Sequence, residues 1–371
     1  MVMKHLTLQQ MLAILFLGIC IACTPVKKQL TTANVNQPMG QVELRLSDLL
    51  EDIQVVPLQT NDSVLIGSRA KAAITDQYII ILEPEKVFQF SKEGKYIRTL
   101  AVRGNGPGEF NTMVNPIVVP GEEILYYIDF KDIHSIGSIN LESGEIQNPI
   151  RFDIKNFGLF ASDSEGYIYG IPNSGMKPIP DSTDLTTTYA FKYNPQKNDL
   201  EKYQAKRPFY ASMFGNAMIG DGRKVSFINS NYSDTLYNIS NVYLQPECIL
   251  ALESEITGSV SLGSELRFLY LSSAGLIFQR FDSERKNNER RILKSEYMLL
   301  DKQQQPQIIK SVIISPFTYI VEMNDMKIYP IPTVSGNYGY LFIDAMDYKI
   351  VDPESNVSQN DNPVLIFGKI K

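Results

Sequence analysis

The chain has 371 residues, of which 44% are hydrophobic and 20% charged, and its formal net charge is -6. This composition predicts one large or two ordinary globular domains and excludes a wholly disordered chain. A mildly acidic chain also argues against binding to a nucleic-acid backbone, which needs a clustered basic face, so no nucleic-acid partner is expected.

The N-terminus has the order of an export signal. Lys4 precedes the apolar run MLAILFLGICIAC, which is too short to cross a membrane as a helix. The run ends in CIAC and resembles the lipobox of bacterial lipoproteins. Cys23 is the predicted lipidation site, because Ile19 is a poor residue before cleavage at Cys20. We therefore predict a lipoprotein signal peptide over 1–22; a plain signal peptide with incidental cysteines is the alternative.

The polar residues 23–41 are predicted to form a flexible tether between the lipid and the folded part. Cys248 is then the cysteine left within the folded part, and its apolar surroundings favour a buried, inert thiol. The two histidines are His5, in the signal, and His134. A Cys–His nucleophile or a multi-histidine metal site is therefore not expected, and we predict neither a metal site nor a cofactor.

From about Val42 onward, short apolar runs alternate with Gly, Asn, Asp and Pro clusters, a pattern typical of many strands. Asp76 to Leu100 predicts three strands with a tight turn at KEGK, and Glu122 to Ile150 repeats this layout. Further copies follow at 165–204, 222–246, 266–293 and 311–344. A spacing of about 45–50 residues with four short strands per unit is typical of propeller blades.

The predicted fold is therefore all-β: a six-bladed β-propeller of four-stranded antiparallel blades over residues 42–371. Strand-like residues at both ends of this range, Val42 to Thr60 and Asn362 to Lys371, are expected to pair within one blade. Such pairing of the chain ends would close the ring and remove an exposed sheet edge.

The stretch GNGPGEF follows the last predicted strand of one unit and precedes the first of the next. Its glycines do not have the spacing of a phosphate-binding loop, and a strand rather than a helix follows it. Glycines permit unusual backbone angles, a proline stiffens the turn and a phenylalanine can fill apolar space between blades. We interpret the stretch as a structural blade linker made of Gly104, Gly106, Pro107, Gly108, Glu109 and Phe110.

The segment FSKEGKYIRTLAVRGNGPGEFNTMVNPIVV resembles the NHL-type repeat, and the whole chain resembles the six-bladed β-propeller lipoproteins of the Bacteroidota. Four segments carry the second resemblance, in order: Leu50–Gly67, Gly104–Phe110, Tyr232–Pro246 and Asp361–Lys371. The resemblance implies a lipid-anchored envelope propeller at the outer membrane, without a defined reaction. A periplasm-facing position is expected, because TPVKKQ after Cys23 lacks an acidic cluster.

Ligand sites of propellers lie at the mouth of the central channel. The acids that could gather there are Asp76, Glu83, Asp129, Asp163, Asp221, Asp282 and Asp344. A calcium site built from oxygen ligands, or a carboxylate pair for glycoside hydrolysis, would need several of them together. The favoured interpretation is that they are structural surface acids, and no catalytic residue is assigned.

These observations lead to two hypotheses about the function of the protein. The leading hypothesis is a non-catalytic binding module, held to the membrane by its N-terminal lipid, that presents a face to a peptide, glycan or protein ligand. The alternative is an NHL-like lyase or hydrolase with an active site at the channel mouth.

Overall fold

The computed structural model describes residues 30–371, with gaps at 107, 130–131, 133, 152–156, 173–187, 205–215, 221–224, 230–234, 241–242, 252–253, 258–259, 287–288, 315–318 and 323–330. Strands dominate the described residues, and the two helices among them, α2 (Leu46–Leu49) and α3 (Ala345–Val351), are short. The all-β prediction is confirmed.

The strands form five hydrogen-bonded sheets within the described residues. Two four-stranded sheets hold β4 (Lys71–Ile74), β5 (Tyr78–Leu82), β6 (Lys86–Ser91) and β7 (Tyr96–Val102), and β8 (Met113–Val118), β9 (Ile124–Asp129), β10 (Ser135–Asn140) and β11 (Ile146–Arg151). A third four-stranded sheet has the order β26 (Thr333–Ser335), β27 (Tyr338–Ile343), β28 (Val364–Ile370) and β3 (Leu50–Pro57).

The other two sheets are larger. A nine-stranded sheet contains β12 (Phe157–Ser162), β13 (Ile168–Pro172), β14 (Thr188–Asn194), β15 (Asp199–Gln204), β16 (Asn216–Gly220), β17 (Val225–Asn229), β18 (Thr235–Ser240), β19 (Tyr243–Ala251) and β1 (Thr31–Asn34). A seven-stranded sheet contains β20 (Ser254–Thr257), β21 (Val260–Ser272), β22 (Gly275–Lys286), β23 (Glu289–Leu300), β24 (Pro306–Ile314), β25 (Tyr319–Glu322) and β2 (Gly40–Arg45).

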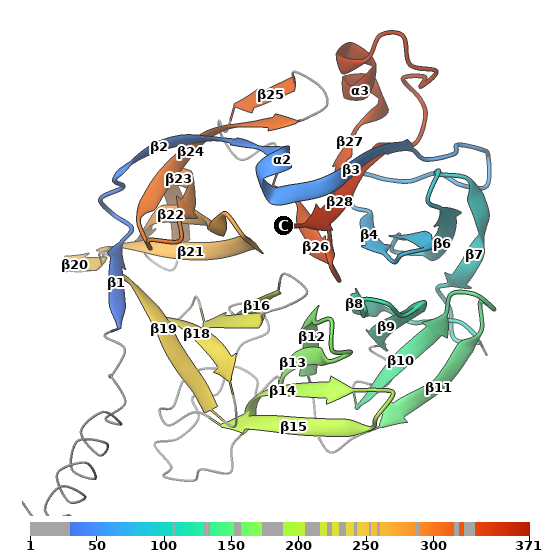
Figure 1. Ribbon diagram of the computed structural model, residues 1–371, viewed down its shortest axis with the longest axis horizontal. Coiled ribbons are helices and arrows are strands. Elements are labelled where there is room, and N and C mark those ends of the chain that lie inside the picture. The colour runs from blue at the N-terminus through green and yellow to red at the C-terminus, as the bar shows by residue number, and fades with distance from the viewer. Residues whose placement is uncertain are drawn as a thin grey trace, which may run out of the picture.

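The sheets surround a common axis and form a β-propeller (Figure 1). Strands β26, β4, β8, β12, β16 and β21 lie nearest this axis, and each contacts the next around the ring. Within the sheets, neighbouring propeller strands pair antiparallel, as predicted for blades. The class of fold, a propeller of antiparallel blades, is therefore confirmed.

The number of sheets corrects the prediction of six blades, because the structure has five sheets. The strands β12–β15 and β16–β19 belong to one sheet. A parallel pairing of Gln204 with Tyr243 joins them, since the outer strands β15 and β19 meet there. Sequence repeats cannot reveal such a junction, because it links the ends of two runs and not strands within one run.

The prediction that the chain ends close the ring also needs correction. The first strands lie elsewhere: β1 pairs parallel with β19, and β2 pairs parallel with β24. The third strand, β3, pairs antiparallel with the C-terminal strand β28, with Leu50 opposite Ile370. Within the stretch Val42 to Thr60, α2 separates two strands that belong to different sheets, so the stretch does not act as one closing element.

The folded part begins before the predicted boundary at Val42. Strand β1 and the start of β2 lie within residues predicted to form a flexible tether. Ala33 and Val35 are buried in an apolar cluster with Cys248, Leu250 and other residues. A polar composition suggested a tether, yet backbone pairing with β19 and two buried apolar side chains hold this segment on the propeller. The burial of Cys248 agrees with the prediction of a buried thiol.

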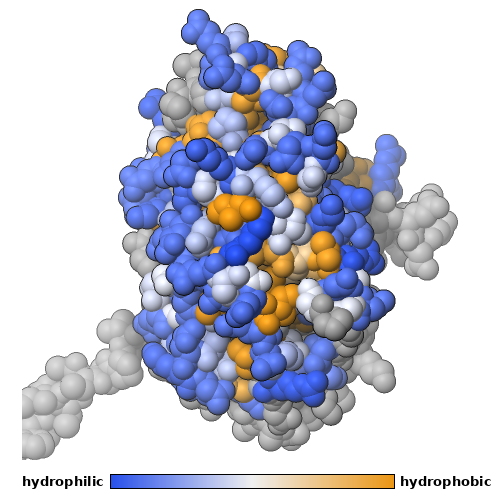
Figure 2. Space-filling model, turned by 90° about the vertical axis from the view of Figure 1, so that its right-hand side faces the viewer, coloured by the Kyte–Doolittle hydropathy of each residue, from blue (hydrophilic) through white to orange (hydrophobic). Residues whose placement is uncertain are grey.

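Strand formation follows from the β-branched and aromatic runs, which suit a pleated surface packed on both faces. In β5, Ile79, Ile80 and Ile81 are all buried, although consecutive residues point to opposite faces of the sheet. Each four-stranded sheet is therefore covered on both sides by its neighbours. The surface outside β6 and β7 is mainly hydrophilic, with a hydrophobic area near its middle (Figure 2); the exposed apolar side chains of β7 are Ile97 and Val102.

The linker after β7 folds around its own glutamate. The Glu109 carboxylate accepts a hydrogen bond from the Gly106 backbone N–H (2.7 Å), and a Cβ on Gly104 would lie 2.0 Å from Glu109 Oε2. Gly108 has a φ of 76°, which favours glycine. Pro107 lies outside the described residues. The glycines thus make room for a carboxylate of the chain itself, in the place where a phosphate loop would hold a ligand.

Phe110 ends this linker and is 1% exposed. It packs in one cluster with Leu100 and Ala101 of β7 and Val118 and Leu125 of the next sheet. Its backbone N–H donates to the Val102 carbonyl oxygen (3.1 Å), which fixes the start of the linker against β7. Phe110 therefore fills the apolar space between two adjacent sheets.

Candidate functional site

Of the seven acids singled out in the sequence, the six that the structure describes do not gather in one place. Asp76 follows β4, and Asp163 follows β12, in turns between the first and second strands of their sheets. Glu83 follows β5, and Asp129 ends β9. Both lie between the second and third strands of their sheets, and so at the other end of the strands from Asp76 and Asp163. Asp221 lies outside the described residues. Among the residues that are described, no group of three or more His, Cys, Asp or Glu side chains could hold a metal ion.

Glu83 and Asp129 hold the linkers that enter their sheets. Glu83 Oε1 accepts a hydrogen bond from the Gly67 N–H (2.7 Å). Asp129 accepts from the N–H groups of Asn111 (3.1 Å to Oδ2) and Thr112 (3.2 Å to Oδ1). Each acid thus pairs with backbone donors that a bend in the chain would leave unpaired. Both acids, at the end of the second strand of their sheets, therefore stabilise the fold.

Asp163 and Asp282 are also bonded within the chain. Asp163 Oδ1 accepts from the Tyr167 N–H (3.0 Å), and its Oδ2 accepts from the Tyr169 hydroxyl (2.7 Å). Asp282 forms an ion pair with Arg280 (3.5 Å). Asp344 precedes α3, and its carbonyl oxygen accepts from the Tyr348 N–H.

Asp76 belongs to a cluster that three neighbouring sheets build together, and we call it the Lys92 cluster: Thr75, Asp76, Lys92, Glu123 and Tyr338. Its members lie in or beside turns that join first to second or third to fourth strands. In antiparallel sheets those turns share one end of the strands, so the cluster lies on one face of the ring.

Lys92 is the centre of this cluster. Its Nζ donates to the Thr75 carbonyl oxygen (2.8 Å) and lies 4.3 Å from the centroid of the Tyr338 ring and 4.4 Å from that of Phe367. The Tyr338 hydroxyl donates to Asp76 Oδ1 (2.8 Å). An ammonium group over two aromatic faces and near carboxylates is held in one orientation by cation–π attraction and by charge.

Glu123 closes the cluster from the next sheet. Its Oε2 accepts a hydrogen bond from the Thr75 hydroxyl, and its Oε1 accepts from the Gln77 N–H (3.2 Å). Burial is the main cause that raises the pKa of Glu123 above its usual value. Burial also raises the pKa of Tyr338, and the hydrogen bond from Tyr338 to Asp76 adds to this effect.

Burial lowers the pKa of Lys92 to about 8, although Asp76 and Glu123 oppose this shift. A lysine with such a pKa supplies both a proton donor and a neutral amine near physiological pH. Asp76 and Gln77 are exposed beside it, so a ligand on this face meets a carboxylate, an amide and a half-buried ammonium together. The arrangement suits recognition of a polar ligand by several hydrogen bonds.

Sequence reasoning found Asp76 but missed the other four members. KEGK was interpreted as a turn only, and Tyr338 as part of a strand. The cluster joins turns that are far apart in the chain, so no spacing within one segment could reveal it.

Replacing Lys92 by Met should change how stability depends on pH. The unfolded state binds more protons than the folded one between pH 8 and 10.5, because the folded pKa is about 8 and the ordinary value 10.5. The contribution of Lys92 to the free energy of unfolding therefore rises with pH across this window. We expect the stability of the wild type relative to Lys92→Met to increase by about 1–2 kcal/mol from neutral pH to about pH 10, after allowance for solvent screening.

Urea unfolding of both proteins at the two pH values measures this difference. Lys95→Met, in the same turn but exposed, is the matched control. A relative stability that is the same at both pH values would contradict the assignment.

Cys23, the predicted lipidation site, lies outside the described residues. None of the helices within the described residues is long and apolar enough to cross a membrane.

Comparison with known proteins now defines the class: a β-propeller that belongs to a family known from its sequence model. Residues 30–369 match the family model described as a domain of unknown function, DUF4934. The chain belongs to the DUF4934 family. The resemblance to the NHL-type repeat stays a prediction, because this match does not test it. No curated protein matches the chain.

Two solved structures are similar. One is a protein of Bacteroides fragilis described as exported, with 15% identity and a TM-score of 0.53; the match covers 92% of this chain and 99% of that one. The other is a member of the DUF4221 family from Bacteroides vulgatus, with 12% identity and a TM-score of 0.48, covering 87% and 97% of the two chains. The first likeness supports the propeller fold.

Proposed function

We propose that this protein is a lipid-anchored binding module of the cell envelope, at the outer membrane and facing the periplasm, that holds a peptide, glycan or protein ligand without converting it. Its lipid is carried by Cys23, and the ligand contacts the face that bears the Lys92 cluster. The export signal in the sequence and the likeness to an exported protein of Bacteroides fragilis support the location.

The proposal rests on the hydrogen-bond partners of the acidic side chains. Glu83, Asp129 and Asp163 are engaged in holding turns and linkers, whereas Asp76 and Lys92 form a polar group at an accessible face. Binding sites of propellers lie on such faces because rigid blades position the turns. An NHL-like enzyme, the second candidate, would use the Lys92 amine as a base.

The half-buried ammonium of Lys92 allows a direct test. Reductive methylation of the lysines with ¹³C-formaldehyde gives each amine an NMR signal, and Lys92→Arg identifies the signal of Lys92. We expect that signal to titrate near pH 8 and to shift when a binding peptide or oligosaccharide is added, with the ligand recovered unchanged. Asp76→Asn should weaken binding about tenfold, the loss expected when a charge-assisted hydrogen bond is removed.

Glu93 is exposed and lies in the same turn as Lys92. Glu93→Gln is therefore the matched control and should bind the ligand as the wild type does. Conversion of the ligand would favour the enzyme. Binding that leaves the Lys92 signal in place and is insensitive to Asp76→Asn would refute the site.

Anchoring is tested separately. Cys23→Ala should move the protein from the membrane fraction to the soluble periplasmic fraction, because the diacyl chains that hold a lipoprotein cannot be attached without the thiol. Cys20→Ala is the control and should stay with the membranes. Unchanged fractionation of Cys23→Ala would contradict lipidation at this residue.

A further inference from the structure

The turn that carries Asp76 is contacted from both neighbouring sheets. It joins β4 to β5, and its Thr75 N–H donates to the Tyr78 carbonyl oxygen (3.0 Å). Strand β4 lies between β26 and β8 in the ring (Figure 1). From the side of β26 the Tyr338 hydroxyl reaches the Asp76 side chain, and from the side of β8 Glu123 reaches the rest of the turn.

Glu123 belongs to the turn between β8 and β9, and its two carboxylate oxygens bond two different groups of the β4–β5 turn. Its Oε2 accepts from the Thr75 hydroxyl, and its Oε1 accepts from the Gln77 backbone N–H (3.2 Å). Thr75 is buried, so this carboxylate satisfies a hydroxyl that has little access to water. The Glu123 backbone is fixed as well, since its carbonyl oxygen accepts from the Leu141 N–H (2.9 Å). The side chain therefore bridges two sheets from a fixed base.

The turn between β12 and β13 shows that a sheet can close such a turn with its own residues. The Asp163 N–H donates to the Tyr167 carbonyl oxygen (3.0 Å), the same backbone bond that begins the β4–β5 turn. Asp163 Oδ1 accepts from the backbone N–H groups of Glu165 (2.9 Å) and Tyr167 (3.0 Å). One carboxylate of the turn itself thus binds two of its backbone donors.

In the β4–β5 turn the corresponding contacts come from two sheets. The Thr75 hydroxyl accepts from the Tyr78 N–H (3.0 Å), and the carboxylate that accepts from the Gln77 N–H is that of Glu123. The carboxylate of this turn itself, Asp76, is exposed and accepts from a tyrosine of the other neighbouring sheet. Because Glu123 binds the backbone of the turn, Asp76 is available to a ligand.

We propose that Glu123 is a positioning residue of the ligand site, which clamps the β4–β5 turn and thereby fixes the Asp76 carboxylate. The Thr75 carbonyl oxygen of the same turn accepts from Lys92 Nζ (2.8 Å), so the clamp also fixes the ammonium group. The inference rests on the proposed function, in which the ligand contacts Asp76 and Lys92. It adds to that site a residue that acts without touching the ligand.

The pKa of Lys92 reports where the Asp76 carboxylate lies. Burial lowers this pKa and the Asp76 charge opposes the shift, so Asp76→Asn should lower the pKa of Lys92 further. The ¹³C signal of the methylated Lys92 amine measures this effect without any ligand. The effect of Asp76→Asn is then compared in the wild type, in Glu123→Gln and in Glu123→Leu.

The two variants of Glu123 separate position from charge. Glutamine lacks the charge but keeps both contacts, because its amide oxygen can accept from the Gln77 N–H and its amide N–H can donate to the Thr75 hydroxyl. Leucine keeps neither contact. We expect Asp76→Asn to have the same effect in Glu123→Gln as in the wild type, and less than about half of it in Glu123→Leu, because a displaced carboxylate acts over a longer distance.

Glu122→Leu is the matched control. Glu122 lies in the same turn as Glu123, but its Oε2 accepts from the Tyr126 hydroxyl of its own sheet (2.8 Å). In Glu122→Leu the effect of Asp76→Asn should equal that in the wild type. If Glu123 acted through its charge alone, Glu123→Gln and Glu123→Leu would give equal effects, and this equality would overturn the proposal.

Hydrogen exchange of the wild type tests the clamp without a substitution. The Gln77 amide should exchange at least about tenfold more slowly than in an unstructured chain, although Gln77 is exposed, because it donates to Glu123. Exchange at the rate of an unstructured chain would overturn the proposal even if Glu123→Leu, checked by thermal melts, does not fold. No ligand is added in either experiment. A Lys92 signal that no ligand shifts would therefore refute the proposed function and leave the clamp in place, so the two failures are distinguishable.

Discussion

Phe110→Ala should lower the free energy of unfolding by about 3–5 kcal/mol, the cost of removing a large aromatic side chain from a packed interior. Phe110 is 1% exposed and lies between the sheets β4–β7 and β8–β11. Its removal opens a cavity that backbone hydrogen bonds keep from collapsing, because the Gly104 N–H donates to the Phe110 carbonyl oxygen (2.9 Å) and the Phe110 N–H to Val102. The shift of the urea midpoint, with an unchanged slope, measures the loss.

Ile97→Ala is the control for this variant. Ile97 lies at the start of β7 and is 44% exposed, so its truncation should cost less than about 1 kcal/mol. Phe110→Leu should retain part of the packing and fall between the two. A Phe110→Ala protein as stable as the wild type would show that the linker does not hold the two sheets together.

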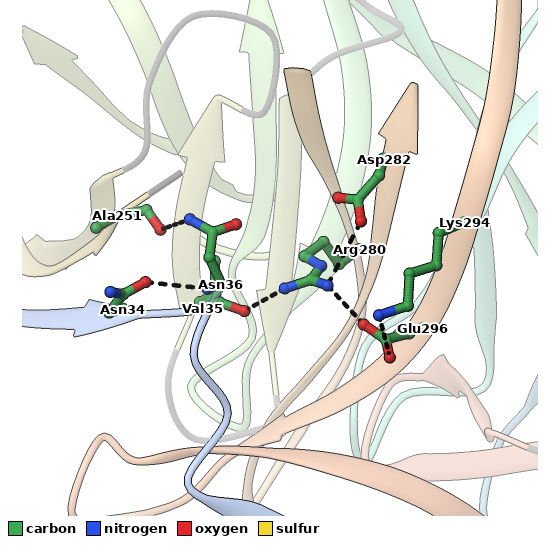
Figure 3. Close-up of polar contacts among 8 residues, drawn as sticks. All are labelled: Asn34, Val35, Asn36, Ala251, Arg280, Asp282, Lys294 and Glu296. Carbon is green, nitrogen blue, oxygen red and sulfur yellow. Dashed lines mark hydrogen bonds and ion pairs between the residues drawn. The ribbon is translucent and has the colours of Figure 1, made fainter. Parts of the chain in front are cut away.

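Arg280→Met should destabilise the protein by about 2–3 kcal/mol, because it removes a charge-assisted hydrogen bond to the partly buried Glu296, which keeps its ion pair with Lys294 (2.8 Å). Arg280 and Glu296 have side-chain exposures of 7% and 15%. The variant also removes the donor to the Val35 carbonyl oxygen (Figure 3), so the N-terminal segment, residues 31–45, should detach first and become sensitive to protease. Urea unfolding and limited proteolysis followed by mass spectrometry measure the two effects.

The double variant Arg280→Met, Glu296→Leu separates the two contributions. Replacing both ions by apolar groups removes the cost of the unpaired charge, so this protein should be more stable than Arg280→Met alone. Arg151→Met is the control, because its ion pair with Asp132 is exposed on the arginine side (76%) and should contribute little. Equal losses for the single and double variants would show that the pairing of Arg280 and Glu296 is not what holds this site.

The sequence was most informative where structure is local. Runs such as YIIIL predict a strand buried on both faces because adjacent residues are apolar, and β5 has this burial. The linker was placed correctly between β7 and β8, since glycines and a phenylalanine at a strand end have a local physical meaning. The sequence did not predict that the Glu109 carboxylate turns back into the linker and accepts a hydrogen bond from the Gly106 N–H.

The sequence did not predict the contacts between distant segments of the chain. TTAN gives no sign that it will pair with CILA, because a short polar strand depends on the edge that receives it. The same holds for Lys92, whose lowered pKa depends on burial against Tyr338 and Phe367, which come from a different sheet.

The sequence by itself determined that this chain is a strand-rich propeller, because periodicity and turn residues are local properties of a polypeptide. Only the tertiary structure decided how many sheets there are, where the N-terminal strands pair, and that Lys92, Asp76 and Glu123 meet. The reason is physical: a strand edge offers the same backbone groups to any partner, so its neighbour is chosen by the packing of the whole ring.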